Sequence, residues 1–137
     1  MNIQKSKNFK RMNTKDKFIE ELKQRTKKFA VDIILFCETL KNCKATSVIT
    51  YQLIKSATST GANYRAACRG RSKSEFFSKV CIVVEESDES LYWLEVIEEA
   101  NLSGDPKELT RLIKEAIEIS KIMTKAKDTT YKNLNGK

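Results

Sequence analysis

The densest group of side chains able to bind an anion is Arg65, Arg69, Arg71 and Lys73. Clusters of arginine and lysine neutralise the phosphates of a nucleic-acid backbone. The net charge of +8 likewise favours an acidic partner, such as nucleic acid, a membrane surface or an acidic protein. Two alternatives stay open. The excess charge can serve solubility, and Arg65 and Arg69 can complement the negative end of a helix and pair with Glu75.

A second group is acidic and contains Glu85, Glu86 and Glu89. The chain has no histidine, which excludes Glu-x-x-His metal pairs and nucleophiles activated by histidine. No glycine-rich phosphate loop is present either. We therefore expect no enzymatic activity, no metal and no cofactor. The acidic cluster is instead expected to form ion pairs, within or between subunits, together with Lys55 and Trp93.

The four cysteines do not have the spacing of a zinc site. They are predicted to be free, buried thiols in a reducing compartment: Cys37, Cys43, Cys68 and Cys81. No apolar run approaches the roughly 18 residues of a membrane span, and the basic N-terminus lacks the apolar core of a secretory signal. We expect a cytoplasmic protein with no membrane partner.

Four helices must position these groups. The chain has 137 residues with only four Gly and one Pro, which favours a single all-α domain. Apolar residues recur at steps of three and four. The expected helices cover residues 15–42, 46–69, 73–103 and 106–131, and the second begins at a cap on Thr46 or Ser47. Residues 1–14 are predicted to be a mobile basic arm, 15–131 a four-helix bundle, and 132–137 a tail.

Start and stop signals separate these segments. Ser72 and Glu75 form a capping box, in which the serine hydroxyl accepts a hydrogen bond from a free backbone N–H. Asp105 and Pro106 have the types expected at an N-cap and at the first helical position. Because the connections are short, the prediction is an up-down-up-down antiparallel bundle. The glycines expected to end the preceding helices are Gly70 and Gly104.

Counting along the helices separates the two charged groups. In an antiparallel hairpin that turns at Gly70, residues equally far from the turn lie side by side. At 1.5 Å per residue, Arg65 lies about 8 Å from the turn and Glu86 about 22 Å, so the two cannot pair within one hairpin. The acidic cluster instead faces the level of Lys55. The same counting gathers these bases at one basic end: Arg65, Arg69, Arg71 and Lys73, with Lys23, Arg25, Lys27 and Lys28 of the first helix and Lys127 and Lys132 of the last.

Two patterns concern packing. Gly61 costs about 1 kcal/mol in a helix interior, which predicts that a neighbouring helix approaches it closely. It lies on the apolar face of the second helix, beside a second stripe of small residues that includes Ser56. The third helix is apolar on more than one side, with Tyr92 and Trp93 widening its buried face. Because such a helix needs more than one neighbour, the pattern indicates association between subunits.

Three segments, GANY (61–64), RAACRGRSKSEF (65–76) and EESDESLYWLE (85–95), together resemble one bacterial family, and ELKQRTKKFA (21–30) also fits. These are four-helix bundle proteins encoded in intervening sequences of 23S rRNA genes, sometimes labelled S23 ribosomal proteins. The resemblance covers about residues 20–125. It implies a bundle that assembles as a homopentameric ring and no established enzymatic activity. A related group assists reverse transcriptases as a nucleic-acid-binding subunit, so a reverse transcriptase is a possible partner by analogy.

Two hypotheses follow. In the first, the protein is an oligomer that binds the RNA or DNA backbone through the basic end, at Arg65, Arg69, Arg71, Lys73, Lys23, Arg25 and Lys27. In the second, it is a scaffold or protein-interaction ring without direct contact to nucleic acid. The expected partners are other copies of the chain, and RNA, DNA or another protein.

Overall fold

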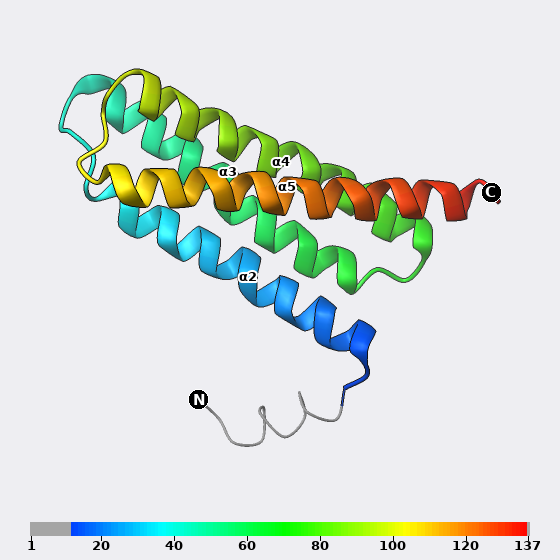
Figure 1. Cartoon of the computed structure of the whole chain (residues 1–137). Helices are drawn as coiled ribbons and strands as arrows, with labels where there is room; N and C mark the ends of the chain where they lie inside the picture. Colours follow the sequence, from blue (N-terminus) through cyan, green and yellow to red (C-terminus); the bar gives the residue numbers. More distant parts are fainter. Residues whose placement is uncertain (1–11, 137) are drawn as a thin grey trace.

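The computed structural model describes residues 12–136, which form four helices and no strand (Figure 1). The all-α class is therefore confirmed. The helices are α2 (Thr14–Cys37), α3 (Lys44–Cys68), α4 (Lys73–Glu99) and α5 (Pro106–Leu134). The α2–α3 and α4–α5 connections lie at one end of the molecule, and the α3–α4 connection lies at the other (Figure 1). Most of the predicted N-terminal arm, residues 1–11, lies outside the described residues.

Two of the predicted helix starts are confirmed. The hydroxyl of Ser72 accepts a hydrogen bond of 3.1 Å from the backbone N–H of Glu75, which caps α4. Asp105 accepts one of 3.2 Å from the N–H of Glu108, with Pro106 in the first turn of α5. These side chains satisfy backbone donors that the first turn of a helix leaves free.

The predicted cap of α3 was wrong. The helix begins at Lys44 with Cys43 as N-cap, so it starts two residues before Thr46. The Thr46 hydroxyl donates to the carbonyl of Lys41 and lies 3.1 Å from the Cys43 thiol. Thr46 therefore fastens the preceding connection to the first turn instead of capping the helix.

Two helices end earlier than predicted. In both cases the chain leaves the helix where the two connections at this end contact each other. α2 stops at Cys37 instead of residue 42, and α4 stops at Glu99 instead of residue 103. The N–H of Lys41 donates to the carbonyl of Leu102, 2.9 Å away, so the two connections pair with each other. Asn101 supplies the left-handed turn after α4, with φ 55°, a conformation that asparagine tolerates better than most residues.

The glycines near these ends serve close approach instead of a left-handed turn. A Cβ on Gly104 would lie 2.1 Å from the carbonyl oxygen of Thr39, so the facing connection leaves room only for hydrogen. A Cβ on Gly70 would lie 3.1 Å from the carbonyl oxygen of Ala67. Positive φ among the described residues occurs only at Asn101 and Gly136. Gly70 does occupy the predicted position directly after the C-cap Arg69, but without a positive φ. The prediction that Gly104 ends the preceding helix was wrong, because α4 already ends at Glu99.

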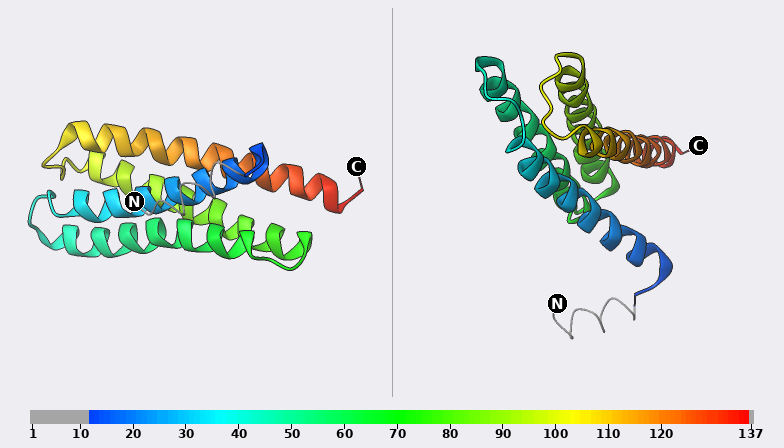
Figure 2. Two further views of the ribbon diagram at one scale, coloured as in Figure 1. Left: turned by 90° about the horizontal axis from the view of Figure 1, so that it is seen from below. Right: turned by 60° about the vertical axis from the view of Figure 1, so that its left-hand side comes forward.

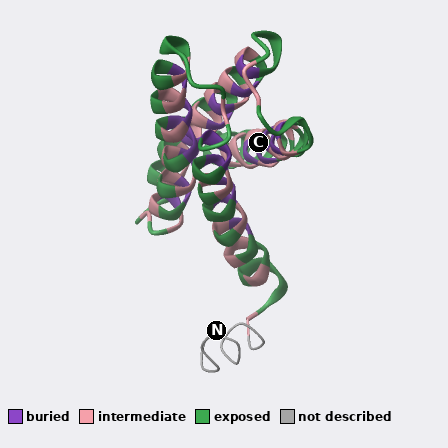
Figure 3. Ribbon diagram, turned by 90° about the vertical axis from the view of Figure 1, so that its left-hand side faces the viewer, coloured by how far each residue is buried: buried purple, intermediate pink, exposed green. Residues whose placement is uncertain are grey.

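The core lies along the centre of the four helices (Figure 3). Its fully buried side chains include Ile33, Leu53, Ile97 and Leu112, one from each helix. The small residues of α3 allow α3 and α4 to pack closely. Ser90 of α4 donates a buried hydrogen bond of 2.9 Å to the hydroxyl of Ser56. Part of the small-residue stripe of α3 therefore packs against α4 of the same chain.

The first turns of α2 diverge from the other helices (Figures 1 and 2). Phe18 lies on this segment and is 54% exposed, although its spacing of four residues from the buried Leu22 predicts a place on the same apolar face. Further along α2, Thr26 is fully buried against α3 at Gly61, so the predicted close approach at Gly61 is confirmed. Within residues 12–136, no helix combines the length and apolar character needed to cross a membrane.

Candidate nucleic-acid interface

The end of α3 and the start of α4 present four basic side chains at one end of the molecule. Arg65 lies in the last turn of α3, Arg69 is its C-cap residue, and Arg71 and Lys73 flank the Ser72 cap of α4. All four side chains are exposed. Arg69 and Arg71 lie within the connection, which is only four residues long, and Arg65 and Lys73 lie on its two sides. Gly70 and Ser72 hold the geometry of the connection. We call this group the basic end.

Ion pairing hardly neutralises the basic end. Arg71 lies 3.4 Å from Glu75, but the two side chains are 90% and 48% exposed, so the pair contributes little. No salt bridge to Arg65, Arg69 or Lys73 is present within residues 12–136. The alternative in which Arg65 and Arg69 pair with Glu75 is thus not realised here; the partner of Glu75 is Arg71.

Two of the predicted basic residues of α2 extend this surface. Lys23 is half-buried and close enough to Cys68, at the end of α3, to act on its thiol. Burial raises the pKa of Cys68, while a hydrogen bond with Tyr64 and the charge of Lys23 lower it. Glu20 is also near this thiol, so α2 brings one acid as well. Lys27 is exposed, one turn further along α2.

Arg25 is committed elsewhere. Its Nε and Nη2 atoms donate to the two carboxylate oxygens of Glu115 on α5, each over 2.7 Å. This two-bonded pair raises the pKa of Arg25, against the opposing effect of burial. Lys28, which the count along the helices also placed at this end of the molecule, lies 2.8 Å from Asp32. Arg25 therefore joins α2 to α5. Its guanidinium group is paired with a carboxylate, whereas the sequence prediction assumed that it was free to bind phosphate.

The acidic cluster forms no salt bridge within the described part of the chain. Glu89 accepts a hydrogen bond of 3.1 Å from the indole N–H of Trp93, one turn along α4. Glu85 is exposed and Glu86 half-buried, and Lys55 on α3 is exposed. No group of three metal-ligating side chains occurs among residues 12–136. The cluster's role at a subunit contact stays a prediction.

The four cysteines are free, as predicted, but not all are buried. Cys37 is buried, and burial raises its pKa to about 11. Cys43 is exposed at the start of α3, where a hydrogen bond with Thr46 lowers its pKa. The prediction of four buried thiols was therefore right only for Cys37. Cys68 and Cys81 are half-buried, and Cys43 is exposed because its N-cap position lies outside the packed face of the helix.

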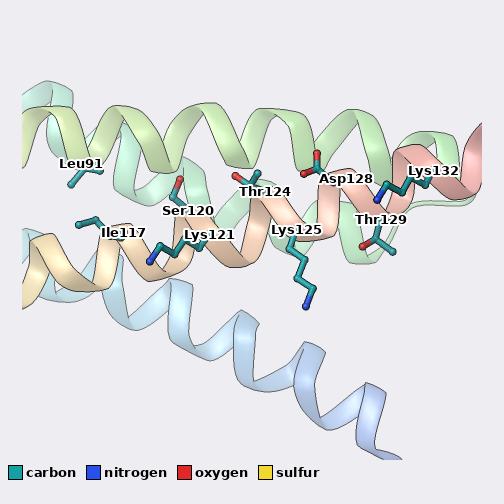
Figure 4. Close-up of a pocket in the computed structure, with 9 residues that line it drawn as sticks. All are labelled: Leu91, Ile117, Ser120, Lys121, Thr124, Lys125, Asp128, Thr129 and Lys132. Atoms are coloured by element: carbon teal, nitrogen blue, oxygen red, sulfur yellow. The ribbon is translucent and has the colours of Figure 1, made fainter.

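A groove of about 550 Å³ between α4 and α5 was not among the predicted sites (Figure 4). Leu91 of α4 and Ile117 of α5 line one end of it (Figure 4). Three lysines line it, Lys121, Lys125 and Lys132. These lysines share one side of the last helix, and a count of positions along the helix axis alone does not reveal this spacing. The other lining residues are Ser120, Thr124, Asp128 and Thr129.

Known proteins resemble this chain in sequence and in fold. A family model described as 23S rRNA-intervening sequence protein matches residues 20–125. Among solved structures, the chain is similar to a crystal structure of a protein of unknown function from the S23 ribosomal protein family of Bacteroides thetaiotaomicron. The two are 27% identical with a TM-score of 0.71, and the match covers 80% of this chain and 97% of that one.

The comparison with curated proteins gave no match. The family match nevertheless spans most of the four helices, including both sides of the basic end. The structural match also includes nearly the whole length of the Bacteroides protein. The chain belongs to the 23S rRNA-intervening sequence protein family.

Proposed function

We propose that this protein is a non-enzymatic, oligomeric four-helix bundle that binds the phosphate backbone of RNA or DNA through its basic end. The observation that carries the proposal is the exposure of Arg65, Arg69 and Lys73 with no acidic partner within the described residues. Arginine and lysine side chains in this state attract phosphates, and binding releases the counterions condensed on the nucleic acid.

The proposed assembly is a homopentameric ring of up-down-up-down antiparallel bundles. In such a ring with parallel subunits, five basic ends share one face, which multiplies weak phosphate contacts. The outer side of α4 supports association, because it combines Ile82 and Tyr92, 38% and 55% exposed, with the unpaired acids Glu85 and Glu86. The exposed Lys55 of a neighbouring copy is the proposed partner of these acids.

A second candidate function is a scaffold ring that recruits a protein partner. It is favoured by apolar side chains on the outer sides of two helices. Val31, Ile34 and Leu35 on α2 are 43–62% exposed, and Val48 and Tyr51 on α3 are 61% and 63% exposed. Such residues mark contact surfaces when they lie close together. An apolar surface of this kind binds another protein and does not need nucleic acid as a ligand.

The two functions are separated by titrating fluorescent RNA and DNA oligonucleotides at low salt. The double variant Arg65→Glu with Arg69→Glu reverses the two unpaired arginines of the basic end. The matched control, Lys41→Glu with Lys44→Glu, reverses two exposed charges at the opposite end. We expect a loss of affinity of at least about tenfold in the first variant and little change in the control. Equal affinities of the two variants contradict the proposal.

Both variants are first compared with the wild type by circular dichroism and by light scattering. The substituted side chains are exposed, so helix content and mass should not change. If the wild type binds no oligonucleotide but retains a specific protein from its own cell extract, the scaffold function replaces the proposed one.

A further inference from the structure

The outer face of α5 carries a line of lysines. The lysines occur at intervals of seven, seven, four and seven residues, and all of them are exposed. Residues at these intervals lie on one side of an α-helix. At 1.5 Å per residue the line is about 38 Å long. We call it the α5 lysine track, and its members are Lys107, Lys114, Lys121, Lys125 and Lys132.

The track lies opposite the buried side of α5. Leu112, Ala116, Ile119 and Met123 are at most 1% exposed and pack into the core. The apolar side of the helix is therefore used inside the bundle. A basic amphipathic helix that binds a lipid surface needs a free apolar side to insert. This arrangement favours a soluble polyanion over a membrane as the ligand of the lysines.

The acids of α5 do not neutralise the track. Glu108 pairs with Arg111 over 2.6 Å, and Glu115 holds Arg25 through two hydrogen bonds. Glu118 lies close enough to Arg25 to raise its pKa. No salt bridge involves a lysine of the track among residues 12–136. Of the acids on this helix, only Asp128 lines the groove beside the track.

The groove adds hydroxyl groups to the charges. Ser120, Thr124 and Thr129 line it together with three lysines of the track (Figure 4). Thr110 and Thr130, on the same helix, donate to carbonyls one turn back. The three groove hydroxyls form no such hydrogen bond within the described part of the chain. Hydroxyl groups beside lysines commonly donate to phosphate oxygens in complexes with nucleic acid.

The track meets the basic end. The ring of Tyr131, next to Lys132, packs at a tilt against that of Phe77 of α4, with ring centroids 5.9 Å apart. Phe77 is one helical turn after Lys73. The C-terminal end of α5 and the α3–α4 connection lie at the same end of the molecule (Figure 1). The C-terminal end of the track and the basic end thus lie at the same end of the molecule.

We propose that the α5 lysine track binds the phosphate backbone of the nucleic acid that enters at the basic end and guides it along the bundle. This inference rests on the proposed function. Phosphates of one strand are spaced by about 3.4 Å along a B-form axis, so a track of about 38 Å spans roughly eleven of them. The contacts are to the backbone, so binding should be similar for unrelated base sequences.

The test measures the salt dependence of oligonucleotide binding for matched variants. Lys121→Gln with Lys125→Gln removes two charges of the track, and Lys41→Gln with Lys44→Gln removes two charges at the end away from the basic end. Each lost phosphate contact lowers the slope of log K against log salt by about one. We expect the track variant to lose about two units of slope for both RNA and DNA. The control should keep the wild-type slope.

The outcomes separate this inference from the proposed function. A wild-type slope in the track variant overturns the inference, while a loss of binding on reversal of Arg65 and Arg69 then still supports the basic end. A reduced slope in the track variant with an intact basic-end variant supports the track and contradicts the proposed entry site. Binding to vesicles that contain phosphatidylserine, without binding to oligonucleotides, overturns both. Circular dichroism of the Gln variants checks that they fold.

Discussion

Gly61 of α3 lies directly against Thr26 of α2. A Cβ added to Gly61 would lie 3.3 Å from the Thr26 hydroxyl and 3.4 Å from its carbonyl carbon and oxygen. Thr26 is fully buried, and its hydroxyl donates to the carbonyls of Leu22 and Lys23. This contact fixes α2 beside α3, although the first turns of α2 diverge from the bundle.

Substitutions at Gly61 should therefore depend steeply on size. Alanine gains up to about 1 kcal/mol of helix propensity, which offsets the strain of a contact only slightly too short. We expect Gly61→Ala to change the free energy of unfolding by less than about 1 kcal/mol, and Gly61→Val to lower it by about 2 to 3 kcal/mol. Urea denaturation followed by circular dichroism measures both. Equal stability of the two variants would show that α2 is not held here.

Gly104 should tolerate no side chain at all. A Cβ there would lie 2.1 Å from the backbone oxygen of Thr39, which cannot rotate away. We expect Gly104→Ala to destabilise the protein by about 3 kcal/mol, at the upper end of overpacking costs. Asn42→Ala, at an exposed position in the facing connection, serves as control. A Gly104→Ala melting temperature equal to that of the control contradicts the packing described between the two connections.

The pair between Arg25 and Glu115 should couple α2 to α5 modestly. The two side chains are 38% and 23% exposed, so solvent screens the pair. A double-mutant cycle with Arg25→Gln and Glu115→Gln should give a coupling energy of about 1 kcal/mol at low salt, which decreases as salt is added. A coupling energy of zero at low salt would show that the two hydrogen bonds do not persist in solution.

Acid should remove the contribution of Arg111. Hydrogen bonds from Arg111 hold the pKa of Glu108 below its ordinary value. Burial raises the pKa of Asp32, but hydrogen bonds from Lys28 and Arg111 outweigh it and leave a lowered pKa. A carboxylate whose pKa falls on folding stabilises the protein above its unfolded pKa, and this contribution is lost as the pH falls through the folded value.

The stability difference between the wild type and Arg111→Gln should therefore be full near pH 7 and shrink below about pH 4. Urea denaturation at a series of pH values measures it. Lys114→Gln, which removes a charge with no salt bridge among residues 12–136, should show no such pH dependence. A difference for Arg111→Gln that stays constant from about pH 7 to about pH 3 contradicts the role of these pairs.

Features encoded by neighbouring residues could be predicted from the sequence. Ser72 and Asp105 start their helices because the bonds that they form reach only three residues along the chain. The close approach at Gly61 could be predicted because glycine destabilises a helix interior, and a close contact with a neighbouring helix compensates for this cost. The ends of α2 and α4 could not, because they depend on the hydrogen bond between Lys41 and Leu102, two residues far apart in sequence.

The charged surfaces were predicted only in part, for a similar reason. Counting residues along each helix placed Arg65 and Arg69 at one end of the molecule, next to Lys23. It could not give the rotation of α2 about its own axis, which turns Arg25 towards Glu115. The lysines of the α5 lysine track fall on one side of the helix, opposite its buried side. This arrangement depends on positions around the helix axis, which a count along the axis does not give.

The most direct test of the central claim is the affinity of the unmodified protein for a fluorescent oligonucleotide, measured from low to physiological salt. Phosphate binding through the basic end predicts tight binding at low salt and a linear fall of log K with log salt, by one unit for roughly each phosphate neutralised. The predicted result is a steep slope shared by RNA and DNA of unrelated sequence. No binding at low salt, or an affinity that does not change with salt, would contradict it.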